Sequence, residues 1–226
     1  MWLWVISILS AILAFSLGLV LFFRNRHPEP HYNWENIDLD SISFSKDFLW
    51  GTATAAHQVE GNLANNWSDF EQKNELEKSG IACDHWNKWK DDFELLSNLG
   101  LSTYRFSIEW SRLEPEEGTW DSGTMNQYSE MVDNLIERGI RPVVTLHHFS
   151  HPIWWEQKGG FTNQNNIPAF VNYCTRVFDS LSDRVEVWCT INEPTVFSTM
   201  GYTLGQFPPG KRSIRLTIKV MKNLMR

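Results

Sequence analysis

The longest apolar stretch lies at the N-terminus, where residues 2–23 include no charged residue. As a helix, this stretch is long enough to cross a hydrocarbon layer of about 30 Å. Arg24 and Arg26 follow it, and it lacks the basic start of a cleaved signal peptide, which is the competing interpretation. We therefore expect a single-pass transmembrane anchor over residues 2–23 that contacts the lipid bilayer. The positive-inside rule then places the remainder on the cytoplasmic side.

Residues 24–46 are polar and contain two prolines, which is typical of a linker. From residue 47 onward, short β-rich runs alternate with stretches of helical period. The pattern predicts strands over residues 48–54, 102–108, 141–147 and 185–191, and helices over 86–99, 124–138, 168–181 and from 213 onward. Gly100 and Gly139 are expected to end the first two of these helices in the left-handed conformation. This alternation indicates parallel strands joined by crossover helices.

Two α/β architectures fit such a pattern. A doubly wound nucleotide-binding fold needs a glycine-rich turn after its first strand, and residues 51–56 lack the GxGxxG spacing. A TIM (β/α)8 barrel instead places its functional side chains just after each strand. Polar and charged residues follow each of the four predicted strands. The fold class is therefore expected to be α/β, a TIM barrel represented by about four βα units.

Composition narrows the range of partners. The net charge of -7 argues against nucleic acid as a partner. The three cysteines are widely separated and form neither a disulfide framework nor a zinc motif. His147 and His148 are neighbours at a strand end and should point to opposite faces, so no metal site is expected. No cofactor is expected either. The chain has 12 tryptophans, whose flat apolar faces suit the faces of sugar rings, although most are expected in the core.

The end of the fourth predicted strand carries the most specific candidate chemistry. The apolar run 185–191 is followed by Asn192, Glu193 and Pro194. A proline disfavours the helical conformation in the preceding residue, so we expect Glu193 to be extended with no helix starting directly after it. A carboxyl group at the mouth of an apolar strand resists ionisation and can act as a proton donor. An ordinary polar turn is the alternative interpretation.

The chain also resembles a known family over residues 47–226. The similar motifs are FLWGTATAAHQVEG at 48–61, YRFSIEWSR at 104–112, TLHH at 145–148 and TINEP at 190–194, followed by a GY…PPG loop at 201–210. Together they resemble glycoside hydrolase family 1, the β-glucosidase family.

The resemblance implies a retaining β-glycosidase that hydrolyses β-glucosides or related carbohydrates. Glu193 would be the general acid/base, and Asn192 would bond the sugar 2-hydroxyl. Gln58 and His148 would bind sugar hydroxyls, and Arg105 would lie beside the nucleophile. A retaining enzyme needs two carboxyl groups about 5–5.5 Å apart, one to protonate the leaving oxygen and one to attack the anomeric carbon.

Of the two carboxyl groups that a retaining glycosidase needs, the motif for the second does not occur in the sequence. The family's nucleophile lies in a Glu-Asn-Gly-type motif on the seventh strand, and no such triplet occurs in these 226 residues. We therefore expect residues 47–226 to be the N-terminal half of a barrel, truncated before the nucleophile and inactive alone. Two alternatives stay open. One is a transglycosylase that acts on membrane glycolipids, and the other is a non-catalytic remnant.

Several residues depart from the family pattern or invite another interpretation. His57 stands where the family more often has tyrosine, and His151 lies where it commonly has leucine. These changes put the substrate preference in doubt. The Asn66-Trp67-Ser68 sequon is expected to be structural, and Glu114 is expected to lie on the solvated surface.

Overall fold

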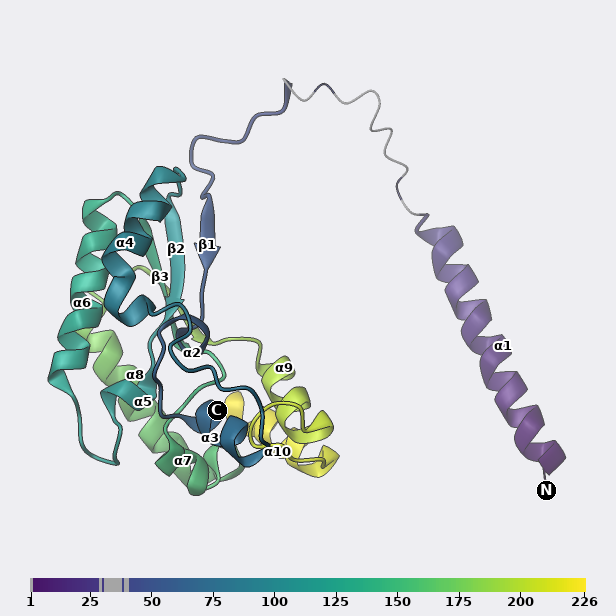
Figure 1. Ribbon diagram of the computed structural model, residues 1–226. Coiled ribbons are helices and arrows are strands. Elements are labelled where there is room, and N and C mark those ends of the chain that lie inside the picture. The colour runs from purple at the N-terminus through teal and green to yellow at the C-terminus, as the bar shows by residue number, and fades with distance from the viewer. Residues whose placement is uncertain (1, 29, 31–37, 39–40) are drawn as a thin grey trace. The chain divides into compact units, whose positions relative to one another are not determined.

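The computed structural model describes residues 2–28, 30, 38 and 41–226 (Figure 1). The chain divides into two compact units, Met1–Phe48 and Leu49–Arg226. Residues 29, 31–37 and 39–40 of the expected linker lie outside the described part of the chain.

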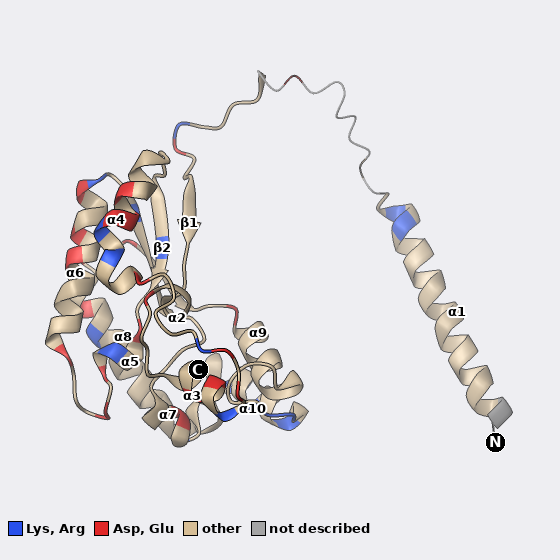
Figure 2. Ribbon diagram, viewed as in Figure 1, with Lys and Arg blue, Asp and Glu red and all other residues tan. Residues whose placement is uncertain are grey.

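The first unit contains one long helix, α1 (Trp2–Arg26). Its segment Trp4–Arg26 is long and apolar enough to cross a membrane, a property that a signal sequence near the N-terminus shares. Lysine and arginine are confined to its carboxyl-terminal end, at Arg24 and Arg26 (Figure 2).

The second unit alternates strands and helices, as the sequence predicts. Its strands are β1 (Gly51–Ala53), β2 (Thr103–Ser107), β3 (Arg141–His147) and β4 (Val187–Ile191). Its helices are α2 (Ala56–Val59), α3 (Asn66–Lys73), α4 (His85–Asn98), α5 (Trp110–Leu113), α6 (Ser122–Glu137), α7 (Ile153–Gln157), α8 (Ile167–Leu181), α9 (Pro194–Thr199) and α10 (Ile214–Leu224), with short 3-10 turns η3 (Gly160–Thr162) and η4 (Gln164–Asn166) and a π-helical turn η5 (Met200–Leu204). The four predicted strands are therefore confirmed, although the first covers only the centre of its predicted range.

The four strands form one parallel sheet in the order β1-β2-β3-β4. Neighbouring strands pair in register from Gly51 opposite Thr103 to His147 opposite Ile191. Helices α4, α6 and α8 flank the sheet, whereas α2, α3, α7, α9 and α10 gather beyond the carboxyl ends of the strands (Figure 1). Because every strand is parallel, the residues that follow the strands meet at this one edge of the sheet.

The core lies between the sheet and the flanking helices. Helix α8 presents Phe170, Tyr173, Val177 and Leu181 inward at helical spacing, and all four are buried. The Tyr173 ring stacks on the fully buried indole of Trp110, with 4.8 Å between ring centroids. This aromatic packing supports the ends of β2 and β3, which bear the site.

The ends of two helices follow from their sequence. Gly100 after α4 and Gly139 after α6 adopt φ of +70° and +72°, which confirms the expected left-handed caps. At the start of α3 the Asn65 side chain accepts hydrogen bonds from the backbone N–H groups of Trp67 and Ser68. This cap fixes the orientation of the Asn65 amide, which matters for the neighbouring site.

Candidate active site

The turn after β4 differs from its prediction. Glu193 adopts φ 40° and ψ 62°, in the left-handed region, and α9 begins directly afterwards at Pro194. The expectation of an extended Glu193 with no following helix is therefore wrong. Proline is well tolerated in the first turn of a helix, and a left-handed Glu193 lets the chain turn sharply into α9. A left-handed non-glycine residue stores strain, and such strain often marks functional turns.

The surroundings of the Glu193 carboxyl also differ from the prediction. The residue is exposed, so its carboxyl group is not the poorly solvated acid that the apolar strand suggested. The neighbouring Asn192 is buried, and its side-chain amide lies 3.5 Å from Glu193 Oε2. The backbone N–H of Asn192 bonds to the carbonyl oxygen of His147 at 2.9 Å, which ties the turn to the end of β3.

The Arg105 side chain links three strands at this edge of the sheet. Its Nη2 donates to Asn192 Oδ1 at 2.6 Å, and its Nε donates to Thr145 Oγ1 at 2.8 Å. Nη2 also lies 3.5 Å from Cys189 Sγ. Hydrogen bonds from a charged group are shorter and stronger than neutral ones. Arg105 therefore holds the Asn192 amide, and with it the start of the Glu193 turn, in a fixed place.

The His148 imidazole is the histidine that faces the site. Burial, together with the positive charge of Arg105, lowers its pKa to about 4, so it is neutral at physiological pH. Its Nδ1 has no hydrogen-bond partner among the described residues. Because Nδ1 is buried, the ring nitrogen that can bond a ligand hydroxyl is Nε2, as donor or acceptor according to the tautomer.

His148 and Gln58 line a common cavity of about 500 Å³. Its other described lining residues include aromatic side chains, Trp67 and Phe149, and a polar group formed by His57, Glu71 and Ser79. The structure thus places Gln58 and His148 in one cavity. It also places Arg105 against Asn192, the residue before Glu193. Arg105, Asn192 and Glu193 are not among the described residues that line the cavity. The two groups are linked by the charge of Arg105, which acts on His148.

His147 and His151 take no part in this cavity. His147 is buried against the rings of Phe161 and Phe197, with centroid distances of 5.3 Å to each. Its Nε2 lies 3.2 Å from His151 Nδ1, and His151 Nε2 lies 2.7 Å from Glu156 Oε2. Both histidines are therefore packing residues at the end of β3 and in the loop that follows it.

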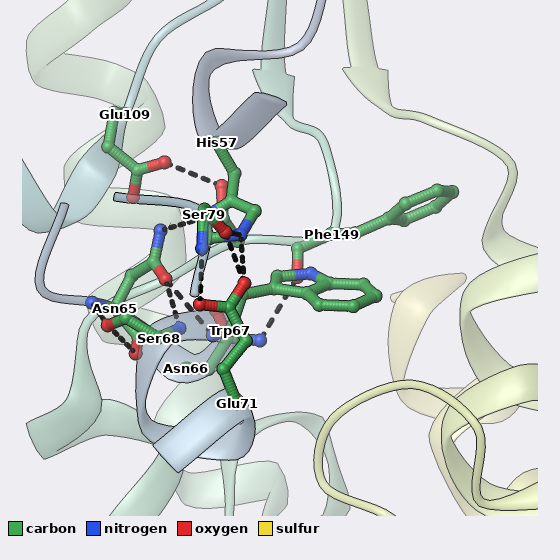
Figure 3. Close-up of polar contacts among 10 residues, drawn as sticks. His57, Asn65, Asn66, Trp67, Ser68, Glu71, Ser79, Glu109 and Phe149 are labelled. Carbon is green, nitrogen blue, oxygen red and sulfur yellow. Dashed lines mark hydrogen bonds and ion pairs between the residues drawn. The ribbon is translucent and has the colours of Figure 1, made fainter. Parts of the chain in front are cut away.

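The polar wall of the cavity centres on His57 (Figure 3). His57 Nδ1 lies 3.2 Å from Asn65 Nδ2, and its Nε2 lies 2.9 Å from Ser79 Oγ and 3.3 Å from Glu71 Oε1. The imidazole stacks on the Trp67 indole, with 5.6 Å between ring centroids. The polar ring that replaces the expected tyrosine is thus bonded on both of its nitrogens.

The sequon is structural, as predicted. Asn66 is buried, and its side-chain nitrogen donates to the carbonyl oxygen of Phe149 at 3.0 Å. An amide committed to this bond inside the fold ties α3 to the loop after β3.

Glu60 and Glu114 are two of the carboxyl groups buried in the second unit. Glu60 accepts hydrogen bonds from Tyr128 Oη at 2.6 Å and from Arg112 Nε at 2.7 Å. Burial nevertheless dominates and raises the pKa of Glu60 to about 7. The expectation of a solvated Glu114 is wrong, since it is buried and accepts a bond of 2.8 Å from Trp110 Nε1. The helical spacing of these two residues brings the indole N–H to the carboxylate.

Sequence reasoning missed several residues of the site. Thr145 belongs to the TLHH motif, and the signal for it is the alternation along β3, which puts it on the same face as Val143, the strand partner of Arg105. Glu71 and Ser79 carried no recognisable signal, because they reach the cavity only through the folding of α3 and the segment that follows it.

Comparisons with known proteins agree with this arrangement. The family model for glycosyl hydrolase family 1 matches residues 40–226. Beta-glucosidase A of Thermotoga maritima is 39% identical over 198 residues, which cover 81% of this chain and 44% of that protein. A 6-phospho-beta-galactosidase of Clostridium acetobutylicum is 35% identical over 191 residues, which cover 81% of this chain and 40% of that protein.

A solved structure gives the same result. Beta-glucosidase from Thermotoga maritima in complex with castanospermine superposes with a TM-score of 0.77 at 36% identity, covering 80% of this chain and 44% of that one. The fold is thus that of the TIM-barrel β-glucosidases, of which the described sheet supplies four parallel strands. The chain spans less than half the length of the relatives that it matches. With the family model matching residues 40–226, the chain belongs to glycosyl hydrolase family 1.

Proposed function

We propose that this chain carries the acid/base side of the active site of a retaining β-glycosidase that acts on β-glucosides or related sugars. Glu193 is the general acid/base, and Asn192 bonds the sugar 2-hydroxyl. Gln58 and His148 bind hydroxyls of the same sugar in the shared cavity. Arg105 positions Asn192 and lies beside the nucleophile, whose Glu-Asn-Gly-type motif does not occur in these 226 residues.

The observation that carries this proposal is the 2.6 Å bond between Arg105 and Asn192. It joins residues from two strand ends next to Glu193, whose exposed carboxyl group is free to meet a glycosidic oxygen. Beside them, the neutral His148 lines the cavity, and its Nε2 can bond a hydroxyl as donor or acceptor. An uncharged sugar needs directed hydrogen bonds of this kind, rather than a formal counter-charge.

Retaining hydrolysis needs a second carboxylate about 5–5.5 Å from the first. The proposal therefore expects the 226-residue chain to bind a β-glucoside without hydrolysing it. Binding can be followed by NMR during titration with methyl β-glucoside, and turnover with an aryl β-glucoside. Glu193→Gln should leave binding within about twofold, whereas His148→Ala should weaken it about tenfold through the loss of a ligand hydrogen bond. Turnover by the isolated chain would contradict the assignment of the missing nucleophile.

A second part of the proposal concerns α1. We propose that this helix anchors the chain in a membrane, supported by its length, its apolar composition and the cations at its end. The expressed chain should then remain with the membrane fraction after alkaline extraction, and a chain that starts at residue 47 should not. Recovery of a shortened chain in the soluble fraction, with residues 2–23 removed, would identify a signal sequence instead.

A further inference from the structure

The wall formed by His57, Glu71 and Ser79 is shared by two cavities. These three residues line the cavity of about 500 Å³ that contains Gln58 and His148. They also line a second cavity of about 340 Å³. A ligand that binds beside Gln58 in the larger cavity is therefore close to the polar side chains of this wall.

The direction of each hydrogen bond in the wall can be deduced from Asn65. Its side-chain oxygen is the atom that accepts from the N–H groups of Trp67 at 3.0 Å and Ser68 at 3.1 Å, so its nitrogen faces His57. That nitrogen can only donate, and His57 Nδ1 is therefore the acceptor. The imidazole proton then lies on Nε2 and points toward Ser79 and Glu71.

The remaining bonds all end on the Glu71 carboxylate. The hydroxyl of Ser79 donates to Glu71 Oε1, and the backbone N–H of Ser79 donates to Oε2 at 3.0 Å. Since Nε2 of His57 holds a proton, it cannot take one from Ser79, so the three residues do not form a nucleophilic triad. They form a chain of donors that converges on one carboxylate.

This arrangement keeps Glu71 charged. Burial opposes its ionisation, but the hydrogen bonds from Ser79 and His57 outweigh that effect and leave the pKa of the carboxyl below its ordinary value. Among the described lining residues of the larger cavity, none is a lysine or an arginine. Toward the larger cavity the wall thus presents a negative charge and hydrogen-bond acceptors. The nearby cations lie outside that lining, since Lys78 lines only the smaller cavity and Arg105 acts on His148 from outside it.

We infer that the Glu71 carboxylate makes this cavity select uncharged sugars over phosphorylated ones. The inference rests on the proposed role of the cavity as a sugar site and adds the charge class of its ligand. Relatives of this chain carry both kinds of name, β-glucosidase and 6-phospho-β-galactosidase, so family membership does not decide between them. A phosphate within about 8 Å of an ionised carboxylate is repelled strongly enough to change binding by about tenfold.

The test compares the affinities of methyl β-glucoside and its 6-phosphate for the 226-residue chain in neutral detergent micelles. Each sugar is titrated into the protein, and binding is followed by the NMR signal of the Trp67 indole N–H. The wild-type chain should bind the uncharged glucoside more tightly. In Glu71→Gln, the ratio of the affinity for the glucoside to the affinity for its 6-phosphate should fall about tenfold, mainly because the phosphate binds more tightly. Asp69→Asn is the matched control, because Asp69 lies on the same helix and lines only the smaller of the two cavities. It should leave the ratio unchanged.

The possible results separate the inference from the proposed function. If neither sugar binds, the assignment of the cavity as a sugar site fails. If the glucoside binds but Glu71→Gln and Asp69→Asn shift the ratio equally, general charge explains the selectivity and the inference is overturned. Should Glu71→Gln not fold, the wild-type chain at low and high salt gives the answer, because screening should narrow the ratio. A ratio independent of salt would contradict the inference.

Discussion

Arg105 in β2 donates a hydrogen bond of 2.6 Å to the side chain of Asn192, 87 residues further along the chain. The same guanidinium lowers the pKa of His148, to which burial makes the larger contribution. One cation thus orders the amide beside Glu193 and keeps a nearby imidazole neutral. This coupling leads to the first prediction.

Replacing Arg105 with methionine should raise the pKa of His148 from about 4, because a positive charge that opposes protonation is removed. The pKa should stay below 6.5, since burial remains. An NMR titration of the His148 ring measures it. Arg141→Met is the matched control, since Arg141 is exposed at the start of β3 and pairs with Glu186. An unchanged His148 pKa in Arg105→Met would show that the guanidinium does not act on the imidazole.

The buried Glu60 predicts a stability that depends on pH. Its pKa is raised from 4.5 to about 7 in the folded chain, so the folded state holds a proton that the unfolded state releases. The stabilising contribution is complete below pH 4.5 and is lost as the pH rises to about 7. The loss amounts to about 3 kcal/mol. Urea unfolding at a series of pH values measures the slope.

The corresponding variant is Glu60→Gln, which keeps an acceptor for Tyr128 but does not titrate. Its free energy of unfolding should vary less between pH 4.5 and 7 than that of the wild-type chain. Equal slopes for the two proteins would assign the pH dependence to other groups.

The left-handed turn at Glu193 predicts that glycine at this position gives a more stable protein than alanine, which is the reverse of the usual order. Elsewhere in regular structure glycine is less stable than alanine by about 0.5–1 kcal/mol. At φ 40° the alanine Cβ is strained and glycine is not, so Glu193→Gly should be more stable than Glu193→Ala by about 1 kcal/mol. Thermal unfolding of both variants decides this. The ordinary order, with alanine more stable, would mean that the turn is not left-handed in solution.

Removing the Tyr173 hydroxyl is predicted to lower the stability of the fold by the contribution of one hydrogen-bond donor. It lies 2.8 Å from the carbonyl oxygen of Leu146 and 3.1 Å from that of Ile108, at the ends of β3 and β2. Tyr173→Phe leaves the ring packing intact but removes the donor inside the core. The free energy of unfolding should fall by about 1–2 kcal/mol. Tyr202→Phe is a suitable control, because the Tyr202 hydroxyl is buried with no partner among the described residues. Its removal should cost less, and an equal cost for both would contradict the role given to Tyr173.

Local pattern was enough to predict the four strands of the second unit, their parallel direction and the helices α4, α6, α8 and α10. It did not predict the short helices that follow the strands. The apolar period along residues 102–108 and 141–147 places β2 and β3, and Gly100 and Gly139 end helices because only glycine adopts that conformation freely. The motifs around Gln58, His148 and Asn192 also carried enough signal to name the family. These features depend on neighbours within a few residues, which a sequence displays directly.

Tertiary structure alone decided which side chains meet. The left-handed turn at Glu193 depends on the paired end of β4 and the start of α9, and it overrides the preference that Pro194 imposes on the residue before it. The wall of His57, Glu71 and Ser79 joins residues up to 22 positions apart, none of which is apolar or periodic. Side chains that meet across the carboxyl ends of parallel strands are placed by sheet register and helix packing, and neither is written in the local sequence.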